Sequence, residues 1–508
     1  MNLKFKIAGI VAGAAACWTF APSATAQVSA DALLDKLVAK GILKADEAQQ
    51  LKDESATNNA EGTKFKISNV IKSVEIYGDL RFRFEDRSAK LGPEAGNSVY
   101  DAANRFRYAL RLGIRGDLAD DFYYGLRFET SPNERSPWNT FGGSSGSQGT
   151  YYGPFSKANN YSVFIGQAYL GWRPTSWLDV SVGRVPQPLY TTPMVWDSDF
   201  APEGLVEKVK YTYGPVDYFA TLGQYVYQDT TPNSDFAIQG QSAASVLGPT
   251  PVNNAYLLVW QIGGTYHVDT NLSIKIAPVF YSYVGHGNQN SGFYGPFIGQ
   301  GQAGYTFFPG TSTSGIPGGF GVTQSYNQTG INNLSILELP MQVDFKIGSL
   351  DARAFGDFSI NLQGDDRARA AYAAGEAINP NAFPGGVQLN QDQAMQFGLA
   401  VGNNLDLLYS AKPKKGTWEA RAYWQHVEQY ALDPNLLDSD FFEGRGNMQG
   451  LYTGFAYSLT DATIATVRYG LAERINRQLG TGGYNADLPL PNPIDRYQIV
   501  QLDLTWKF

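Results

Sequence analysis

The sequence predicts an all-β protein: a 16-stranded antiparallel transmembrane β-barrel preceded by a short periplasmic helical segment. Three observations support this prediction: apolar and charged residues alternate strictly, short and long connections alternate, and the chain ends on an aromatic residue. No segment of the mature chain approaches the roughly 18 apolar residues that a membrane helix requires, so a helical membrane protein is excluded.

Residues 1–26 have the features of a secretory signal peptide. The segment begins with the basic residues Lys4 and Lys6, and residues 7–20 are mostly apolar. Ala24-Thr25-Ala26 forms an A-x-A cleavage site. Cleavage there would remove Cys17, the only cysteine; lipidation at Cys17 is the alternative. The mature chain would then have no disulfide, no thiolate metal site and no cysteine nucleophile.

The charge balance argues against nucleic acid as a partner. Loss of Lys4 and Lys6 from the 39 basic residues leaves 37 against 47 acidic residues, a formal charge of −10. Charged residues make up only 17% of the chain and aromatic residues 14%. This composition fits a barrel with aromatic girdles better than a large cytosolic enzyme.

Residues 27–62 are predicted to form a periplasmic helical segment and a linker. The apolar residues at helical spacing are Leu33, Leu34, Leu37, Val38, Ile42, Leu43 and Leu51. Ser29 is a candidate N-cap, and Gly41 separates two short helices. The segment could be a small hairpin or a short oligomerising coiled coil. The barrel itself is predicted to span residues 74–508.

Residues 74–85 and 105–115 give the clearest evidence for a sheet with one apolar and one charged face. The apolar face carries Val74, Ile76, Gly78, Leu80, Phe82, Phe84, Phe106, Tyr108, Leu110, Leu112 and Ile114. The other face carries Glu75, Tyr77, Asp79, Arg81, Arg83, Glu85, Arg105, Arg107, Arg111 and Arg115. Alternate residues of a strand point to opposite faces. A soluble sandwich buries its apolar face, whereas a membrane barrel presents it to lipid around a watery lumen.

The connections sort into short turns and long loops, as in outer-membrane barrels. Short turns are predicted at 116–121, 174–176, 214–215, 268–271, 348–349, 403–416 and 459–461. Long loops are predicted at 86–104, 130–161, 186–204, 228–254, 285–333, 361–392, 427–447 and 472–495. Fifteen connections imply sixteen strands, and an even number places both barrel ends on the periplasmic side. The strands at 206–213 and 448–458 are placed mostly by position.

The closing strand, Gln498–Phe508, alternates without interruption and ends on Phe508. A terminal aromatic residue on such a strand resembles the signal by which bacterial barrels are recognised for assembly. Together with the signal peptide and the two classes of connection, it favours the barrel over a soluble sheet that ends by chance.

The sequence resembles bacterial porins, in particular the putative-porin family of Gram-negative outer membranes. The resemblance rests on the N-terminal helical segment, Val182–Pro188, Trp196–Gly204 and the closing strand. It implies that the third outside loop, residues 186–204, folds into the lumen and narrows it. It also implies a homotrimer in the outer-membrane lipid.

Inward-facing arginines on the first three strands suggest one wall of a narrow throat. We expect the pore constriction to consist of Arg81, Arg83, Arg107, Arg111 and Arg127 facing Asp197, Asp199 and Glu203. Opposed charges in a narrow lumen would create a transverse field. The simpler alternative is that the arginines form local salt bridges with Glu75, Asp79, Glu85 and Glu129.

No pattern in the sequence indicates an enzyme, a cofactor or a metal site. His267, His286 and His426 are scattered, and neither G-x-S-x-G nor H-E-x-x-H occurs in a suitable context. The acids at 438, 440 and 443 could bind calcium, but a solvated acidic loop is the preferred interpretation. The sequence therefore predicts a passive channel for small hydrophilic solutes and ions. An anion-selective channel and a closed barrel whose outside loops bind a partner remain alternatives.

Overall fold

A computed structural model describes residues 68–93, 99–131, 136–141, 162–228, 255–285, 306–307, 322–323, 333–378, 385–481 and 493–508. The predicted signal peptide and helical segment lie outside these residues. One compact unit spans Val70–Phe508. Among the described residues, no helix is long and apolar enough to cross a membrane.

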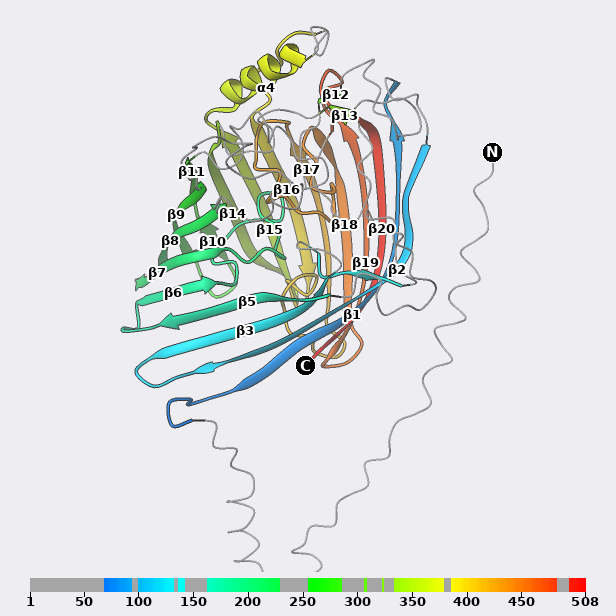
Figure 1. The fold of residues 1–508 in the computed structure, drawn as a ribbon. Helices are drawn as coiled ribbons and strands as arrows, with labels where there is room; N and C mark the ends of the chain where they lie inside the picture. Colours follow the sequence, from blue (N-terminus) through cyan, green and yellow to red (C-terminus); the bar gives the residue numbers. More distant parts are fainter. Residues whose placement is uncertain are drawn as a thin grey trace, which may run out of the picture. The chain divides into compact units, whose positions relative to one another are not determined.

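The unit is a closed antiparallel β-barrel of sixteen membrane-spanning strands (Figure 1). The strands of its first half are β1 Glu75–Leu91, β2 Val99–Asp117, β3 Phe122–Ser131, β5 Ser162–Trp172, β6 Leu178–Arg184, β7 Glu203–Tyr213, β8 Val216–Gln228 and β9 Ala255–His267. Those of its second half are β10 Ser273–Ile276 with β11 Val279–Gly285, β14 Ser335–Ile347, β15 Leu350–Asn361, β16 Gln393–Gly402, β17 Trp418–Val427, β18 Met448–Ser458, β19 Thr463–Arg474 and β20 Ile494–Lys507. The short β4, Asn139–Thr140, pairs with β2, whereas β12 Thr306–Phe307 and β13 Val322–Thr323 pair only with each other.

A proline divides one strand into β10 and β11. Both halves pair with β9 and β14, so they count as a single strand of the barrel. Pro278 lies between them and has no N–H to give to the ladder. Its carbonyl still accepts the Ile262 N–H at 3.2 Å, and Ala277 N–H donates to the Pro340 carbonyl at 3.2 Å.

The barrel closes where the last strand, β20, pairs with the first, β1. Leu80 lies opposite Trp506, and Gly78 and Phe508 exchange backbone hydrogen bonds of 3.0 and 3.1 Å. A Cβ at Gly78 would lie 2.2 Å from the Arg111 carbonyl oxygen and 2.7 Å from the Phe508 ring. Glycine is therefore required where the terminal aromatic side chain crosses the first strand.

The polarity of the barrel is inverted relative to a soluble protein. On β1 and β2 the apolar faces point outward: Phe82 is 43% exposed and Leu112 43%. Arg83 and Arg107, on the alternate positions, are 3% and 2% exposed and face the lumen. An apolar exterior of this kind is stable only in contact with lipid, so the predicted transmembrane barrel is confirmed.

The structure confirms the seven predicted short turns and the strands that had been placed by position, which are β7 and β18. The predicted loop at 86–104 is too long, because β1 continues to Leu91 and β2 begins at Val99. The outward residues Asp86, Ser88 and Lys90 break the apolar alternation there. We attribute this break to strands that extend past the membrane into water, where an outward face no longer needs to be apolar.

The predicted loop at 361–392 contains a helix, α4 Gly364–Ile378. Figure 1 shows α4 at the end of the barrel away from the C-terminus. Ala368 and Ala371 of α4 pack with Tyr430 and Leu479, which belong to two other long loops. The long-loop end of the barrel therefore carries packed structure.

Candidate functional site

The segment between β6 and β7, residues 185–202, lies inside the barrel; we call it the first inward segment. The Tyr190 N–H donates to Gln261 Oε1 at 2.9 Å, and the Tyr190 hydroxyl donates to Gln342 Oε1 at 2.6 Å. The Thr191 hydroxyl donates to Glu338 at 2.6 Å. These acceptors face the lumen from β9 and β14, so the segment reaches far from the strand it leaves.

A second segment, residues 428–447 between β17 and β18, also fills the lumen; we call it the second inward segment. Phe441 and Glu443 of this segment are buried. Asp433 accepts a hydrogen bond of 2.8 Å from the Tyr227 hydroxyl on β8, and Asp440 accepts one of 2.9 Å from Arg83 on β1. The segment thus connects two distant parts of the barrel wall.

The two inward segments share the sequence Asp-Ser-Asp-Phe, at 197–200 and 438–441. Each copy makes the same turn: the first aspartate accepts the N–H of the second, at 2.9 Å in one copy and 3.0 Å in the other. The copies also bind each other, because Asp197 N–H donates to the Leu436 carbonyl at 2.6 Å and Ser439 N–H donates to Asp197 at 3.3 Å. They form one unit.

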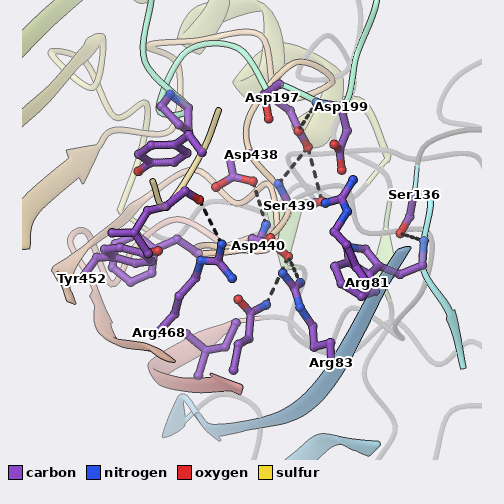
Figure 2. A pocket seen from close by; sticks show the side chains of 18 of the residues that line it. Arg81, Arg83, Ser136, Asp197, Asp199, Asp438, Ser439, Asp440, Tyr452 and Arg468 are labelled. Atoms are coloured by element: carbon purple, nitrogen blue, oxygen red, sulfur yellow. Dashed lines mark hydrogen bonds and ion pairs between the residues drawn. The ribbon is translucent and has the colours of Figure 1, made fainter. Parts of the chain in front are cut away.

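The second aspartate of each copy attaches this unit to the arginines of the wall. Asp199 accepts from Arg111 of β2, and Asp440 lies 2.9 Å from Arg83 and 3.5 Å from Arg87. Figure 2 shows Arg81 and Arg83 approaching these aspartates from one strand, with Arg468 on another side. Cationic strands and anionic segments therefore meet in the lumen.

Trp138 separates several of the like-charged arginines. Its ring centroid lies 4.0 Å from the Arg83 guanidinium carbon and 5.4 Å from that of Arg81. Its carbonyl accepts a hydrogen bond of 2.8 Å from Arg107. A buried indole offers guanidinium groups a favourable π face, so the residue reduces the cost of gathering them.

A cavity of about 130 Å³ lies where the wall meets the two inward segments. Six arginines and four aspartates line it, among other residues. Its volume has room for several water molecules. We call this cavity, with its charged lining, the throat.

The aspartates of the throat differ in acidity. Burial, with the nearby charge of Asp440, raises the pKa of Asp438 to about 7. Burial and the neighbouring carboxylates also raise the pKa of Asp197 well above its usual value. Although burial acts against them, arginine charges hold the pKa values of Asp199 and Asp440 below the usual range. In each motif the second aspartate is therefore the more permanent charge.

The structure places six of the eight residues predicted for the constriction around one cavity. These are Arg81, Arg83, Arg107, Arg111, Asp197 and Asp199. The other two lie elsewhere: Arg127 pairs with Glu129, and Glu203 pairs with Arg184 at 2.8 Å. The local salt bridges of the alternative interpretation also occur, for example Arg81–Asp79 at 2.6 Å and Arg115–Glu75 at 2.7 Å.

Sequence reasoning did not place the second inward segment in the lumen. The preferred interpretation of Asp438, Asp440 and Glu443 as a solvated acidic loop was wrong for Glu443, which is 1% exposed and bound to Arg445. Asp438 and Asp440 are half-buried, and the Asp440 side chain is 38% exposed. The repeated Asp-Ser-Asp-Phe motif was the signal that could have paired this loop with the first. Among the described residues, no cluster of three or more His, Asp or Glu side chains could hold a metal ion.

A closed barrel with an apolar exterior, a charged lumen and folded inward segments defines an outer-membrane β-barrel of the porin class. The family described as "Putative porin" matches residues 69–302 and 334–508 of the sequence. The chain belongs to this family and is a protein of the bacterial outer membrane, as the resemblance had implied.

Two of the solved structures that match the chain come from Comamonas acidovorans and Pseudomonas putida. The anion-selective porin of Comamonas acidovorans is 9% identical, with a TM-score of 0.42, and the match covers 86% of this chain and 99% of that one. OprB of Pseudomonas putida is 10% identical, with a TM-score of 0.44 and coverages of 89% and 97%. No curated protein matches the sequence significantly.

Proposed function

We propose that the protein is a passive diffusion channel for small hydrophilic solutes and ions, constricted at the throat. The observation that supports it most directly is that Arg81 and Arg111 line the same cavity of about 130 Å³ as Asp197 and Asp199. Such opposed charges create a transverse field that acts on every ion passing between them. By resemblance, we propose that the channel assembles as a homotrimer.

Single-channel recording of a double variant tests the arginine wall. Replacing Arg81 and Arg111 together by glutamine removes two positive charges and leaves the four throat aspartates in place. The reversal potential in a KCl gradient should then shift toward cation preference. The matched control is Arg173→Gln with Arg369→Gln, two arginines outside the throat lining. An unchanged reversal potential in the R81Q/R111Q variant would refute the assignment.

Anion selectivity is a second candidate, favoured by one observation: six arginines but only four aspartates line the throat. The reversal potential of the unmodified protein decides between a general channel and an anion channel.

A closed barrel whose long loops bind a partner is favoured by the burial of the second inward segment. Liposome swelling with small sugars separates this candidate from a channel. Only an open lumen admits solute, so liposomes that do not swell would favour the closed barrel.

A further inference from the structure

The throat offers unsatisfied donors on one side. Arg81 Nε donates to Asp79 at 2.6 Å, but among the described residues its Nη2 has no hydrogen-bond partner. Arg111 donates through Nη2 to Asp199, and its buried Nε lies 3.6 Å from Glu129 without a hydrogen bond among the described residues. Both guanidinium groups line the cavity. Water in the cavity can accept from these donors, and a ligand that accepts hydrogen bonds could satisfy them in its place.

The second inward segment offers unused acceptors to the same cavity. The hydrogen bonds to the Asp440 carboxylate from Arg83, Arg87 and Gln501 all go to Oδ1. Its side chain is 38% exposed, and no hydrogen bond within the described chain involves Oδ2. Among the residues that the structure describes, the Asp438 side chain accepts only through Oδ1, from the Asp440 N–H at 3.0 Å. These oxygens favour a cationic or donating group.

Two other arginines of the throat have more carboxylate partners than Arg81 and Arg111. Among the described residues, Arg81 pairs with one carboxylate and Arg111 with two, whereas Arg83 and Arg87 each pair with three. Arg83 forms two hydrogen bonds with Asp503, at 2.8 and 3.0 Å, and Arg87 binds Glu85 at 3.1 Å. A simple anion would satisfy Arg81 and Arg111 but would meet the carboxylates of both inward segments. A simple cation would pair with these carboxylates but would be repelled by Arg81 and Arg111.

We propose that the throat is a binding site for small zwitterions, with a carboxylate toward Arg81 and Arg111 and an ammonium group toward Asp438 and Asp440. The volume of about 130 Å³ suits a solute of amino-acid size. This inference rests on the proposed channel function and assigns it a solute class.

Planar-bilayer conductance with glycine as the probe tests the proposal. At pH 7 and constant KCl, glycine should reduce the channel conductance saturably. Acetate, methylammonium and acetamide at the same concentration should produce a much smaller effect. A protein that forms no conducting pores in KCl would refute the channel function. A conducting pore that shows no saturable effect of glycine, or the same effect with acetamide, would refute only the binding site.

Asp440→Asn provides the site-specific test, with Asp366→Asn on the exposed face of α4 as a charge-matched control. Loss of one charge-assisted hydrogen bond should raise the half-saturating glycine concentration about tenfold in D440N. D366N should behave as the parent protein. Equal glycine responses in all three proteins would overturn the proposal. If D440N does not fold, the comparison of solutes on the parent protein still tests the proposal.

A separate observation concerns the outer wall at β6–β8. Glu207 shares a face of β7 with Tyr211 and Tyr213, which are 62% and 70% exposed, whereas Val206 is buried toward the lumen. The cross-strand row that contains Glu207 is otherwise apolar: Trp172, Val180, Leu222, Trp260, Phe280 and Leu337. A carboxylate therefore lies on the lipid-facing surface within an apolar row, where it is unfavourable.

Further polar groups accompany Glu207 on the same face, and together they form a strip. The Gln224 amide on β8 donates to Glu207 at 3.2 Å, and Arg184 on β6 pairs with Glu203 on β7 at 2.8 Å. Arg184 on β6 and Glu203 on β7 thus neutralise each other at one side of the strip, while Glu207 on β7 is bound to the Gln224 amide on β8 and pairs with no cation among the described residues. If copies of the chain are related by a rotation axis along the membrane normal, the β6 side of the strip on one copy meets the β7–β8 side of the strip on the next copy.

We infer that this strip is an interface with a second copy of the chain, in which Arg184 of one protomer faces the β7–β8 side of its neighbour. A copy in the same membrane reaches this depth, whereas a soluble partner does not. This inference does not depend on channel activity.

Cysteine cross-linking in native membranes tests the interface. Val182→Cys on β6 with Val226→Cys on β8 should be joined between copies by a short bis-maleimide. Val182→Cys with Val467→Cys on β19 is the control, because Val467 and Val226 are equally exposed at 47%. Glu207→Leu should reduce cross-linking of the first pair several-fold. Equal cross-linking of both pairs, or a strictly monomeric protein in membranes, would overturn the inference.

Discussion

At the scale of single residues, the lumen gathers charges that would repel one another without partners. Arg83 and Arg107 lie directly opposite in register on β1 and β2, an unfavourable pairing of like charges. Asp503 from the closing strand and the Trp138 ring each contact Arg83, at 2.8 and 4.0 Å. The burial of Arg83 therefore depends on residues that lie far from it in the sequence.

Asp503→Ala should lower the free energy of unfolding by about 3 kcal/mol, because it leaves Arg83 and Arg468 without their shared buried carboxylate. Urea unfolding in lipid vesicles measures this loss. Glu75→Ala is the control, since its pair with Arg115 is exposed and contributes little. Equal losses in both variants would contradict the prediction.

The pKa of Asp438, about 7, predicts a pH-dependent ion preference. A carboxyl group is charged above its pKa and neutral below it, so lowering the pH from 8 to 6 removes negative charge from the throat. The chloride-to-potassium permeability ratio should therefore rise as the pH falls, measured by reversal potential. Asp438→Asn should hold the ratio near its low-pH value. A parent channel with a pH-independent ratio would contradict the prediction.

The sequence was informative for residues whose position follows from alternation along a strand. Arg81, Arg83, Arg107 and Arg111 were predicted to point inward, and they do. Arg127 also lies on an inward face, but it forms an ion pair with Glu129, two residues further along the same strand. Glu203 belongs to the start of β7 rather than to a loop. Distances across a lumen depend on strand register and loop path, which alternation does not encode.

At the scale of elements, strands and turns could be predicted but the folded loops could not. A strand can be recognised in a sequence because its apolar residues recur at every second position. The second inward segment has no such period, because its burial comes from contacts with distant residues such as Arg83 and Tyr227. The helix α4 has an alanine-rich sequence, but its packing partners, Tyr430 and Leu479, are distant in the chain.

Replacing residues 433–442 by a glycine-serine linker of equal length should increase single-channel conductance several-fold. The substitution removes Asp438, Asp440 and the buried Phe441 from the lumen, and a flexible polar linker does not dock against the wall. The control is a glycine-serine replacement of Lys412–Lys415 in the short-turn region, which should leave conductance unchanged. An unchanged conductance in the first variant would show that the segment does not limit the pore.

At the scale of the whole molecule, the inverted polarity decides which substitutions the barrel tolerates. Leu110 faces outward on β2, opposite Leu80 in the middle of the apolar band, so Leu110→Arg would place a guanidinium in lipid. Its cost is about 2–4 kcal/mol at the midplane. Ser88→Arg is the matched control, because it lies on the outward face of β1 beside the charged Asp86 and Lys90 and should cost little. Unfolding in vesicles should separate the two variants clearly, whereas in a protein folded around a dry core both outward arginines would be tolerated equally.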